Sequence, residues 1–255
     1  MNKEIVKNNV VVRIFPSRAE MGQDAAREAA RRIRRLLAGK SEVNILFASA
    51  PSQNELLEAL VAEEGIEWER VNAFHMDEYI GLAPEAPQGF GNYLKHKIFD
   101  RKNFKSVHYI AGIGGDPDAT CAGYARLLRE HPLDFGFFGI GENGHLAFND
   151  PHVARFDDPE MVKTVDLDLK CRMQQVNDGC FATLEEVPVY AITLTMPVLT
   201  AIPHIFCTVP GAQKANAVRR ALCGGVGTDC PASILQRHGD TTIYLDAESA
   251  ALLEC

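Results

Sequence analysis

Short apolar runs alternate with amphipathic segments along the chain. The runs are rich in β-branched and aromatic residues, and several are apolar at every position, which is typical of parallel strands buried on both faces. We predict strands at Val10–Ile14, Val43–Ala48, Val71–Phe74, Val107–Ile110, Phe135–Ile140, Val189–Leu194, Ile205–Val209 and Thr242–Leu245. Strands that alternate with helical segments predict an α/β fold with a mostly parallel sheet and helices on both faces.

Helix start signals fall between the predicted strands. Ser17 followed by Glu20 is a capping box before a long amphipathic segment that ends near Gly39. Ser52 and Glu55 repeat this pattern before a second helix. Two further helices are predicted to begin at Asp116, which precedes Pro117, and near Gly211. No repeat or long linker interrupts the chain, so a single domain is expected over residues 1–255.

The composition narrows the classes of function. Hydrophobic residues make up 46% and charged residues 24% of the 255 positions, which is ordinary for a globular protein. The net charge of −8 argues against nucleic acid or an anionic membrane as a partner. No run reaches the ~18 apolar residues of a membrane span, and the N-terminus lacks a secretory pattern. Seven cysteines without a C-x-x-C pair indicate reduced thiols, so we expect a cytoplasmic enzyme or small-molecule binder.

Open α/β sheets bind ligands beyond the carboxyl ends of their strands. Four loops in that position carry polar or charged groups directly after a predicted strand. They span residues 49–52, 75–81, 141–151 and 210–214. The coincidence of four such loops predicts a small-molecule site at this edge of the sheet.

The loop in GIGENGHLAFNDP is the most informative of the four. It formally matches G-x-G-x-x-G, but no long amphipathic helix follows and Pro151 comes soon after, which argues against a dinucleotide site. Instead, His145 has Asn143 and Asp150 close by in the sequence, and such neighbours can fix the orientation of a general base. A histidine that is merely buried and hydrogen-bonded is the alternative interpretation.

The loop in FHMDEYIGL places Asp77 and Glu78 directly after an apolar strand. Successive residues point in different directions, so only one of these acids is expected to face the site. A solvated acidic surface is the alternative.

An anion site is predicted from the remaining loops. Ser49, Ser52 and the helix N-terminus after Ser52 offer hydroxyl and N–H donors. Lys214, at the start of another helix, can add a positive charge to the same anion. Arg172 is a further candidate, although nothing local distinguishes it from a surface arginine.

Metal and serine-hydrolase chemistry have little support. The eight histidines form no H-x-x-x-H or H-E-x-x-H pattern, and no G-x-S-x-G motif is present. We therefore expect no metal and no cofactor.

The two longest motifs, FHMDEYIGL and GIGENGHLAFNDP, resemble the signatures of the glucosamine-6-phosphate deaminase/isomerase family, within the wider group that includes 6-phosphogluconolactonases. The segment VPGAQKANAV around Lys214 is similar to that family's phosphate-binding lysine segment, and CRMQQVNDG around Arg172 to its arginine segment. The order and spacing of these motifs match over nearly the whole chain.

This resemblance implies a Rossmann-like fold and the conversion of glucosamine 6-phosphate to fructose 6-phosphate with release of ammonia. It gives Asp77 the role of moving a proton between C2 and C1. It gives His145 the role of opening the pyranose ring, oriented by Asn143 and Asp150. The implied substrate- and phosphate-binding residues are Ser49, Ser52, Gly144, Arg172 and Lys214. The implied partner is a small-molecule sugar phosphate, without a cofactor, and a homo-oligomer is compatible with it.

Two positions and two segments depart from the family pattern. The segment ARFDDPEMVKT replaces the Arg-rich stretch that forms an effector site in allosteric members of the family, and only Lys163 persists. The usual acid at position 143 is Asn143, which can accept a hydrogen bond but carries no charge. The usual glutamate at position 150 is the shorter Asp150. The phosphate loop FASAPSQ contains no glycine, which makes a close approach of phosphate to the backbone harder.

Two alternatives to a deaminase therefore stay open. A 6-phosphogluconolactonase would hydrolyse a lactone on the same fold, although FHMDEY and HLAFND favour the deaminase. A sugar-phosphate sensor that has lost catalysis would explain the departures, although Asp77 and His145 are both retained.

Overall fold

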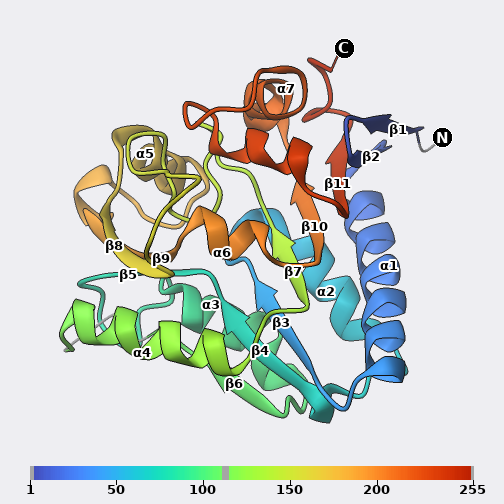
Figure 1. The fold of residues 1–255 in the computed structure, drawn as a ribbon. Coiled ribbons are helices and arrows are strands. Elements are labelled where there is room, and N and C mark those ends of the chain that lie inside the picture. The colour runs from blue at the N-terminus through green and yellow to red at the C-terminus, as the bar shows by residue number, and fades with distance from the viewer. Residues whose placement is uncertain (1–2, 111–114, 254–255) are drawn as a thin grey trace.

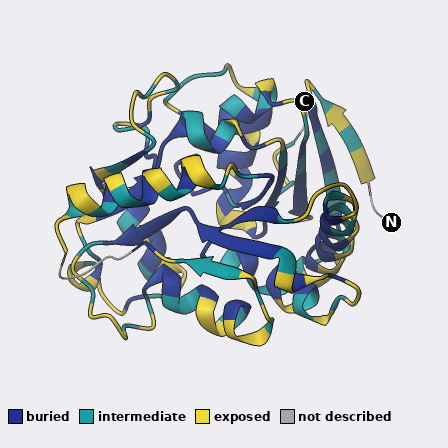
Figure 2. Cartoon of the chain, turned by 60° about the horizontal axis from the view of Figure 1, so that its bottom comes forward, coloured by how far each residue is buried: buried dark blue, intermediate teal, exposed yellow. Residues whose placement is uncertain are grey.

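The computed structural model describes residues 3–110 and 115–253. Its centre is an eight-stranded sheet in which only the edge pair β1–β2 is antiparallel (Figure 1). In spatial order the strands are β1 (Lys3–Lys7), β2 (Val10–Phe15), β11 (Thr241–Asp246), β10 (His204–Val209), β7 (Phe135–Phe138), β3 (Val43–Phe47), β4 (Val71–His75) and β6 (Ser106–His108). Figure 2 shows that the central strands are buried, whereas β1 is largely exposed at the edge.

A second, smaller sheet is antiparallel and was not predicted. It consists of β5 (Asp77–Tyr79), β9 (Tyr190–Leu194) and β8 (Val162–Asp166). The prediction that Val189–Leu194 belongs to the parallel sheet is therefore wrong. An apolar run fits a buried strand in either sheet, and periodicity does not distinguish them.

Helices cover both faces of the large sheet, and a separate core fills the space on each side. One core includes residues of α1 (Arg18–Gly39), α2 (Asn54–Ala62) and α3 (Phe90–Lys97). The other includes residues of α4 (Pro117–Glu130), α6 (Met196–Thr200) and α7 (Ala215–Cys223). A third core joins α5 (Leu169–Asn177) to the small sheet. The predicted α/β class, with a mostly parallel sheet covered on both faces, is confirmed.

The helix starts were predicted with mixed success. Ser17 caps α1 by accepting the Glu20 N–H, and Asp116 caps α4 with Pro117 in the first turn. Ser52 does not cap α2, because residues 51–53 form a short 3-10 helix and α2 begins only at Asn54. α7 begins at Ala215, after a 3-10 turn formed by Ala212–Lys214.

The cysteines correct one further prediction. Five are free, but Cys223 at the end of α7 is disulfide-bonded, so the prediction of reduced thiols is wrong for this residue. Cys255 lies outside the described residues. Among the helices of residues 3–110 and 115–253, none combines the length and apolarity needed to cross a membrane.

Candidate active site

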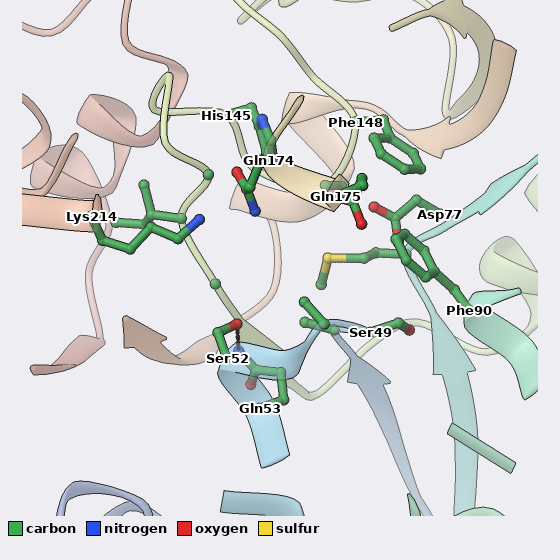
Figure 3. A pocket seen from close by; sticks show the side chains of 17 residues that line it. Ser49, Ser52, Gln53, Asp77, Phe90, His145, Phe148, Gln174, Gln175 and Lys214 are labelled. Atoms are coloured by element: carbon green, nitrogen blue, oxygen red, sulfur yellow. Dashed lines mark hydrogen bonds between the residues drawn. The ribbon is translucent and has the colours of Figure 1, made fainter. Parts of the chain in front are cut away.

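All four predicted loops contribute side chains to one pocket (Figure 3). Ser49 and Ser52 come from the loop after β3, and Asp77 from the junction of β4 and β5. His145 follows β7, and Lys214 follows β10. The pocket therefore lies where the carboxyl ends of the parallel strands meet, as predicted for an open α/β sheet.

Asp77 and Glu78 face different surroundings, because the chain leaves the large sheet after β4 and enters the small one at Asp77. Asp77 lines the pocket, and its Oδ1 has no hydrogen-bond partner in the described part of the chain. Glu78 instead accepts the N–H groups of Tyr79, Phe90 and Gly91 at 2.8–2.9 Å. Glu78 thus holds the N-terminus of α3, and of the two acids only Asp77 lines this pocket.

Burial controls the protonation of both acids. It raises the pKa of Asp77 well above its usual range, and the neighbouring charge of Glu78 raises it further. Burial also raises the pKa of Glu78, although its three backbone hydrogen bonds oppose the shift. A carboxyl with a raised pKa accepts a proton more readily, which suits a group that moves a proton next to a carbonyl.

His75 supports the backbone at Asp77 from behind the pocket. Its Nδ1 lies 2.9 Å from the Asp77 carbonyl oxygen, and its Nε2 accepts the Ile110 N–H at 2.8 Å. These two bonds fix a neutral ring with its proton on Nδ1. Burial lowers the pKa of His75 to about 4, although the bond to the Asp77 carbonyl opposes the shift.

His75 should therefore make the fold sensitive to acid. The unfolded chain takes up a proton near pH 6.5 and the native ring only near pH 4, so stability is complete above pH 6.5 and is lost as the pH falls through this window. The loss amounts to about 3 kcal/mol. Urea unfolding of the wild type and His75→Gln at pH 7.5, 6 and 5 measures it. The stability difference between the two proteins should shrink toward acid; a difference that stays constant with pH contradicts the assignment.

His145 approaches a buried carboxylate in the loop after β7. Its Nδ1 lies 3.0 Å from Oδ1 of Asp150. We interpret the pair as a close electrostatic contact, because Asp150 is fully buried and both groups are held by the loop. Burial raises the pKa of Asp150, but the contact with His145 and a bond from Asn143 outweigh this, so the net pKa is lowered. The shorter Asp150 thus still reaches the imidazole.

Two glycines allow this loop to fold tightly. A Cβ on Gly141 would lie 2.2 Å from Cε1 of His145, so the ring can pack there only against glycine. Gly144 has φ +93° and faces Cys230, which a Cβ would meet at 2.6 Å. Gly144 was predicted to bind the substrate, but it is not among the residues that line the pocket. Its position explains it as a turn residue.

Asn143 holds two carboxylates rather than the imidazole ring. Its Nδ2 donates to Asp150 at 2.8 Å and to Asp168 at 2.9 Å, and its Oδ1 accepts the His145 N–H at 3.0 Å. Asp150 in turn accepts the Asp168 N–H at 3.1 Å. The neutral amide is therefore the shared donor between two acids; an aspartate in this place would have no donor when ionised and only one when protonated.

Replacing Asn143 should harm both stability and activity. Asn143→Leu leaves two carboxylates facing each other without a donor, and we expect the free energy of unfolding to fall by ~2–4 kcal/mol. Asn143→Asp adds a third carboxylate, so its loss should be larger at pH 8 than at pH 5, where a proton restores one donor. Chemical unfolding at both pH values measures these effects. Wild-type stability in Asn143→Leu rules out the bridging role.

Lys214 is the positive charge of the pocket. It is 6% exposed, and its Nζ has no hydrogen bond or ion pair with any described residue. Burial lowers its pKa, while the charges of Asp178 and Glu142 oppose the shift. Ser49, also buried against the pocket, has a hydroxyl oxygen without a partner. Ser52 lines the pocket and accepts from Gln53 at 3.1 Å. An unpaired buried cation in a pocket that serine hydroxyl groups also line is suited to bind an anion.

Arg172, by contrast, is turned away from the pocket. Its guanidinium donates to the carbonyl oxygens of Leu184 and Val187 at 2.7 and 2.9 Å, and it is not among the lining residues. These bonds tie α5 to the turn before β9. The structure therefore does not bring Arg172 together with Lys214.

Several pocket residues were missed by the sequence analysis. α5 supplies Gln174 and Gln175, and the aromatic wall consists of Phe90 and Phe148. Asp168, the N-cap of α5, joins the cluster around Asn143. Only Asp168 carried a usable signal, because an aspartate before a helical segment is a common N-cap.

His145, Asp150 and Cys171 lie close enough to bind a metal ion together. Burial, followed by the charges of Asp150, Asp168 and Asp77, raises the pKa of Cys171 well above its usual range. The contact between His145 and Asp150 explains the cluster without an ion.

Comparison with known proteins shows the family of the chain. The family model described as glucosamine-6-phosphate isomerases/6-phosphogluconolactonase matches residues 16–244. A glucosamine-6-phosphate deaminase of Listeria monocytogenes is 34% identical over 212 residues, which is 83% of this chain and 88% of the relative. A glucosamine-6-phosphate deaminase of an Exiguobacterium species is 33% identical over 233 residues, 91% of this chain and 89% of the relative.

Solved structures give the same result. A monomeric glucosamine-6-phosphate deaminase superposes with a TM-score of 0.85 at 27% identity, covering 94% of this chain and 99% of that chain. The 6-phosphogluconolactonase of Thermotoga maritima superposes with a TM-score of 0.75 at 18% identity, over 93% of this chain and 99% of that one, which shows the common fold alone. The chain therefore belongs to the glucosamine-6-phosphate isomerase/6-phosphogluconolactonase family.

Proposed function

We propose that this protein converts glucosamine 6-phosphate and water to fructose 6-phosphate and ammonia. The observation that carries the proposal is the joint placement of Asp77, His145 and Lys214 around one pocket. A carboxyl that moves a proton, an imidazole and an anion-binding lysine are the groups that this isomerisation with deamination requires. The relatives named as deaminases support the same activity.

In the proposed mechanism Lys214 binds the phosphate, with Ser49 and Ser52 as neutral donors. His145, next to Asp150, assists proton transfer as the pyranose ring opens. Asp77 then moves the C2 proton to C1 while an amine proton passes to O1, which turns the open-chain 2-amino aldose into an imine at C2. Water hydrolyses this C=N bond and gives the ketose and ammonia. Arg172 and Gly144 are left out of this mechanism, because neither lines the pocket.

The test is to measure ammonia release from a panel of hexosamine 6-phosphates, with 6-phosphogluconolactone hydrolysis in parallel. We expect ammonia and fructose 6-phosphate in equal amounts. Lactone hydrolysis without ammonia supports the lactonase alternative, and binding without either reaction supports the sensor. We place this activity in the cytoplasm and propose no nucleic-acid partner. A homo-oligomer is compatible with the proposal, and size-exclusion chromatography with light scattering tests for it.

A further inference from the structure

Gln175 is a buried amide without a partner inside the protein. It is 4% exposed and lines the pocket, yet its side chain makes no hydrogen bond with any described residue. The adjacent Gln174 differs, since its oxygen accepts the Glu142 N–H at 2.9 Å and its nitrogen donates to Asp178 at 3.2 Å. Buried polar groups are nearly always hydrogen-bonded. Because Gln175 lines the pocket and has no partner among the described residues, its amide is free to bond a molecule in the pocket.

The position of Gln175 on α5 turns it toward the acids of the site. Residues four apart share one face of a helix, and Cys171, four residues earlier, lies within the electrostatic influence of Asp150, Asp168 and Asp77. Figure 3 shows the Gln175 side chain among the residues that surround the pocket, on the side of Asp77 and Phe148. Arg172 does not line the pocket, because its guanidinium is bonded to the Leu184 and Val187 carbonyl oxygens. The helix thus presents a neutral amide to the pocket.

We propose that Gln175 is a substrate-binding residue whose carboxamide hydrogen-bonds the bound sugar phosphate. The inference rests on the proposed function for the identity of this ligand. An amide offers both donors and an acceptor, so it can bind a sugar hydroxyl or donate to a phosphate oxygen. Among the described lining residues Lys214 is the only lysine or arginine, so the substrate is held by one charge and by neutral groups.

The experiment compares Gln175→Met with Arg172→Met in the full chain. Methionine has nearly the length of glutamine and forms helices well, but it cannot form this hydrogen bond. Titration calorimetry measures the binding of fructose 6-phosphate, which cannot be aminated while ammonia is absent. We expect Gln175→Met to weaken binding about 3- to 15-fold, the effect of one lost hydrogen bond. Arg172→Met should leave this affinity within twofold of the wild type.

Thermal unfolding separates a binding role from a structural one. Gln175→Met loses no internal hydrogen bond, so its melting temperature without ligand should equal or exceed that of the wild type. Arg172→Met loses two bonds to backbone carbonyls, so its melting temperature should fall. Gln175→Glu is a second variant of the same shape; it keeps the acceptor but brings a negative charge toward the ligand, so it should weaken binding at least as much as methionine does.

Titration with inorganic phosphate locates the contact. A loss of affinity for both ligands in Gln175→Met places the amide at the phosphate, and a loss for fructose 6-phosphate alone places it at the sugar. Wild-type affinity for fructose 6-phosphate in both Gln175 variants overturns the proposal. If the wild type binds fructose 6-phosphate but releases no ammonia from any hexosamine phosphate, the proposed function fails while the result for Gln175 stands. A wild type that binds no sugar phosphate overturns both.

Discussion

Asp77→Asn is expected to lower kcat for ammonia release by about 10²–10⁴, the usual contribution of a positioned general base. The amide keeps the shape of the side chain but cannot take the proton from C2. Phosphate binding should change little, because the anion-binding groups belong to other loops. Affinity for fructose 6-phosphate, measured by calorimetry, should therefore stay within a few-fold of the wild type. Turnover at the wild-type rate excludes Asp77 as the base.

The same substitution should stabilise the protein. The pKa of Asp77 is raised by burial and by Glu78 above its ordinary value of 3.8, so the wild type loses stability as the pH rises from about 4 through the native pKa. Asp77→Asn removes this loss. The difference in free energy of unfolding between the variant and the wild type should therefore grow with pH and then level off. Urea unfolding at pH 5 and pH 8 tests the sign. A variant that is less stable than the wild type at pH 8 contradicts the assigned pKa shift.

Glu78→Gln is the matched control, since it alters the neighbouring acid outside the hydrogen-bonding reach of a ligand. Its amide nitrogen would face a backbone N–H, so stability should fall. Removal of the Glu78 charge should lower the pKa of Asp77 and shift the acidic limb of the kcat/KM profile to lower pH. Asp77→Asn, in contrast, should abolish that limb.

The loops of the site could be predicted from the sequence because each follows an apolar strand. Asp77, His145 and Lys214 were found in this way, and the rule that parallel strands end at one edge was enough to bring them together. The passage of the chain from the large sheet to the small sheet at Asp77 was not predicted. β5 has only three residues, and the sequence of its partner β9 has the apolar pattern of any buried strand. Side-chain direction within a pair such as Asp77 and Glu78 depends on that junction.

The contribution of α5 could not be predicted for a different reason. Its buried face carries Cys171, Gln174 and Gln175, so it has no apolar stripe from which a helix could be recognised. Arg172 was expected to bind phosphate because its segment resembles one of the family, but its guanidinium is bonded to two backbone carbonyl oxygens outside the pocket. Similarly, the role of Asn143 depends on Asp168, which lies 25 residues away in the sequence.

Lys214→Met is expected to weaken the binding of phosphorylated sugars about 10- to 150-fold, since one charge-assisted hydrogen bond contributes ~1.5–3 kcal/mol. No other lysine or arginine among the described lining residues can replace the lost charge. The remaining binding should also respond less to salt, because screening acts on the charge that has been removed. Calorimetry with fructose 6-phosphate at low and high salt measures both effects.

Without ligand, Lys214→Met should be at least as stable as the wild type. Burial lowers the pKa of Lys214, so the charged lysine destabilises the native state at any pH below its native pKa, and methionine removes that cost. Lys40→Met is the matched control, because Lys40 pairs with Asp134 and does not line the pocket. The control should bind fructose 6-phosphate normally. Normal binding by Lys214→Met as well would move the phosphate site elsewhere, since no other unpaired cation faces this pocket in the described part of the chain.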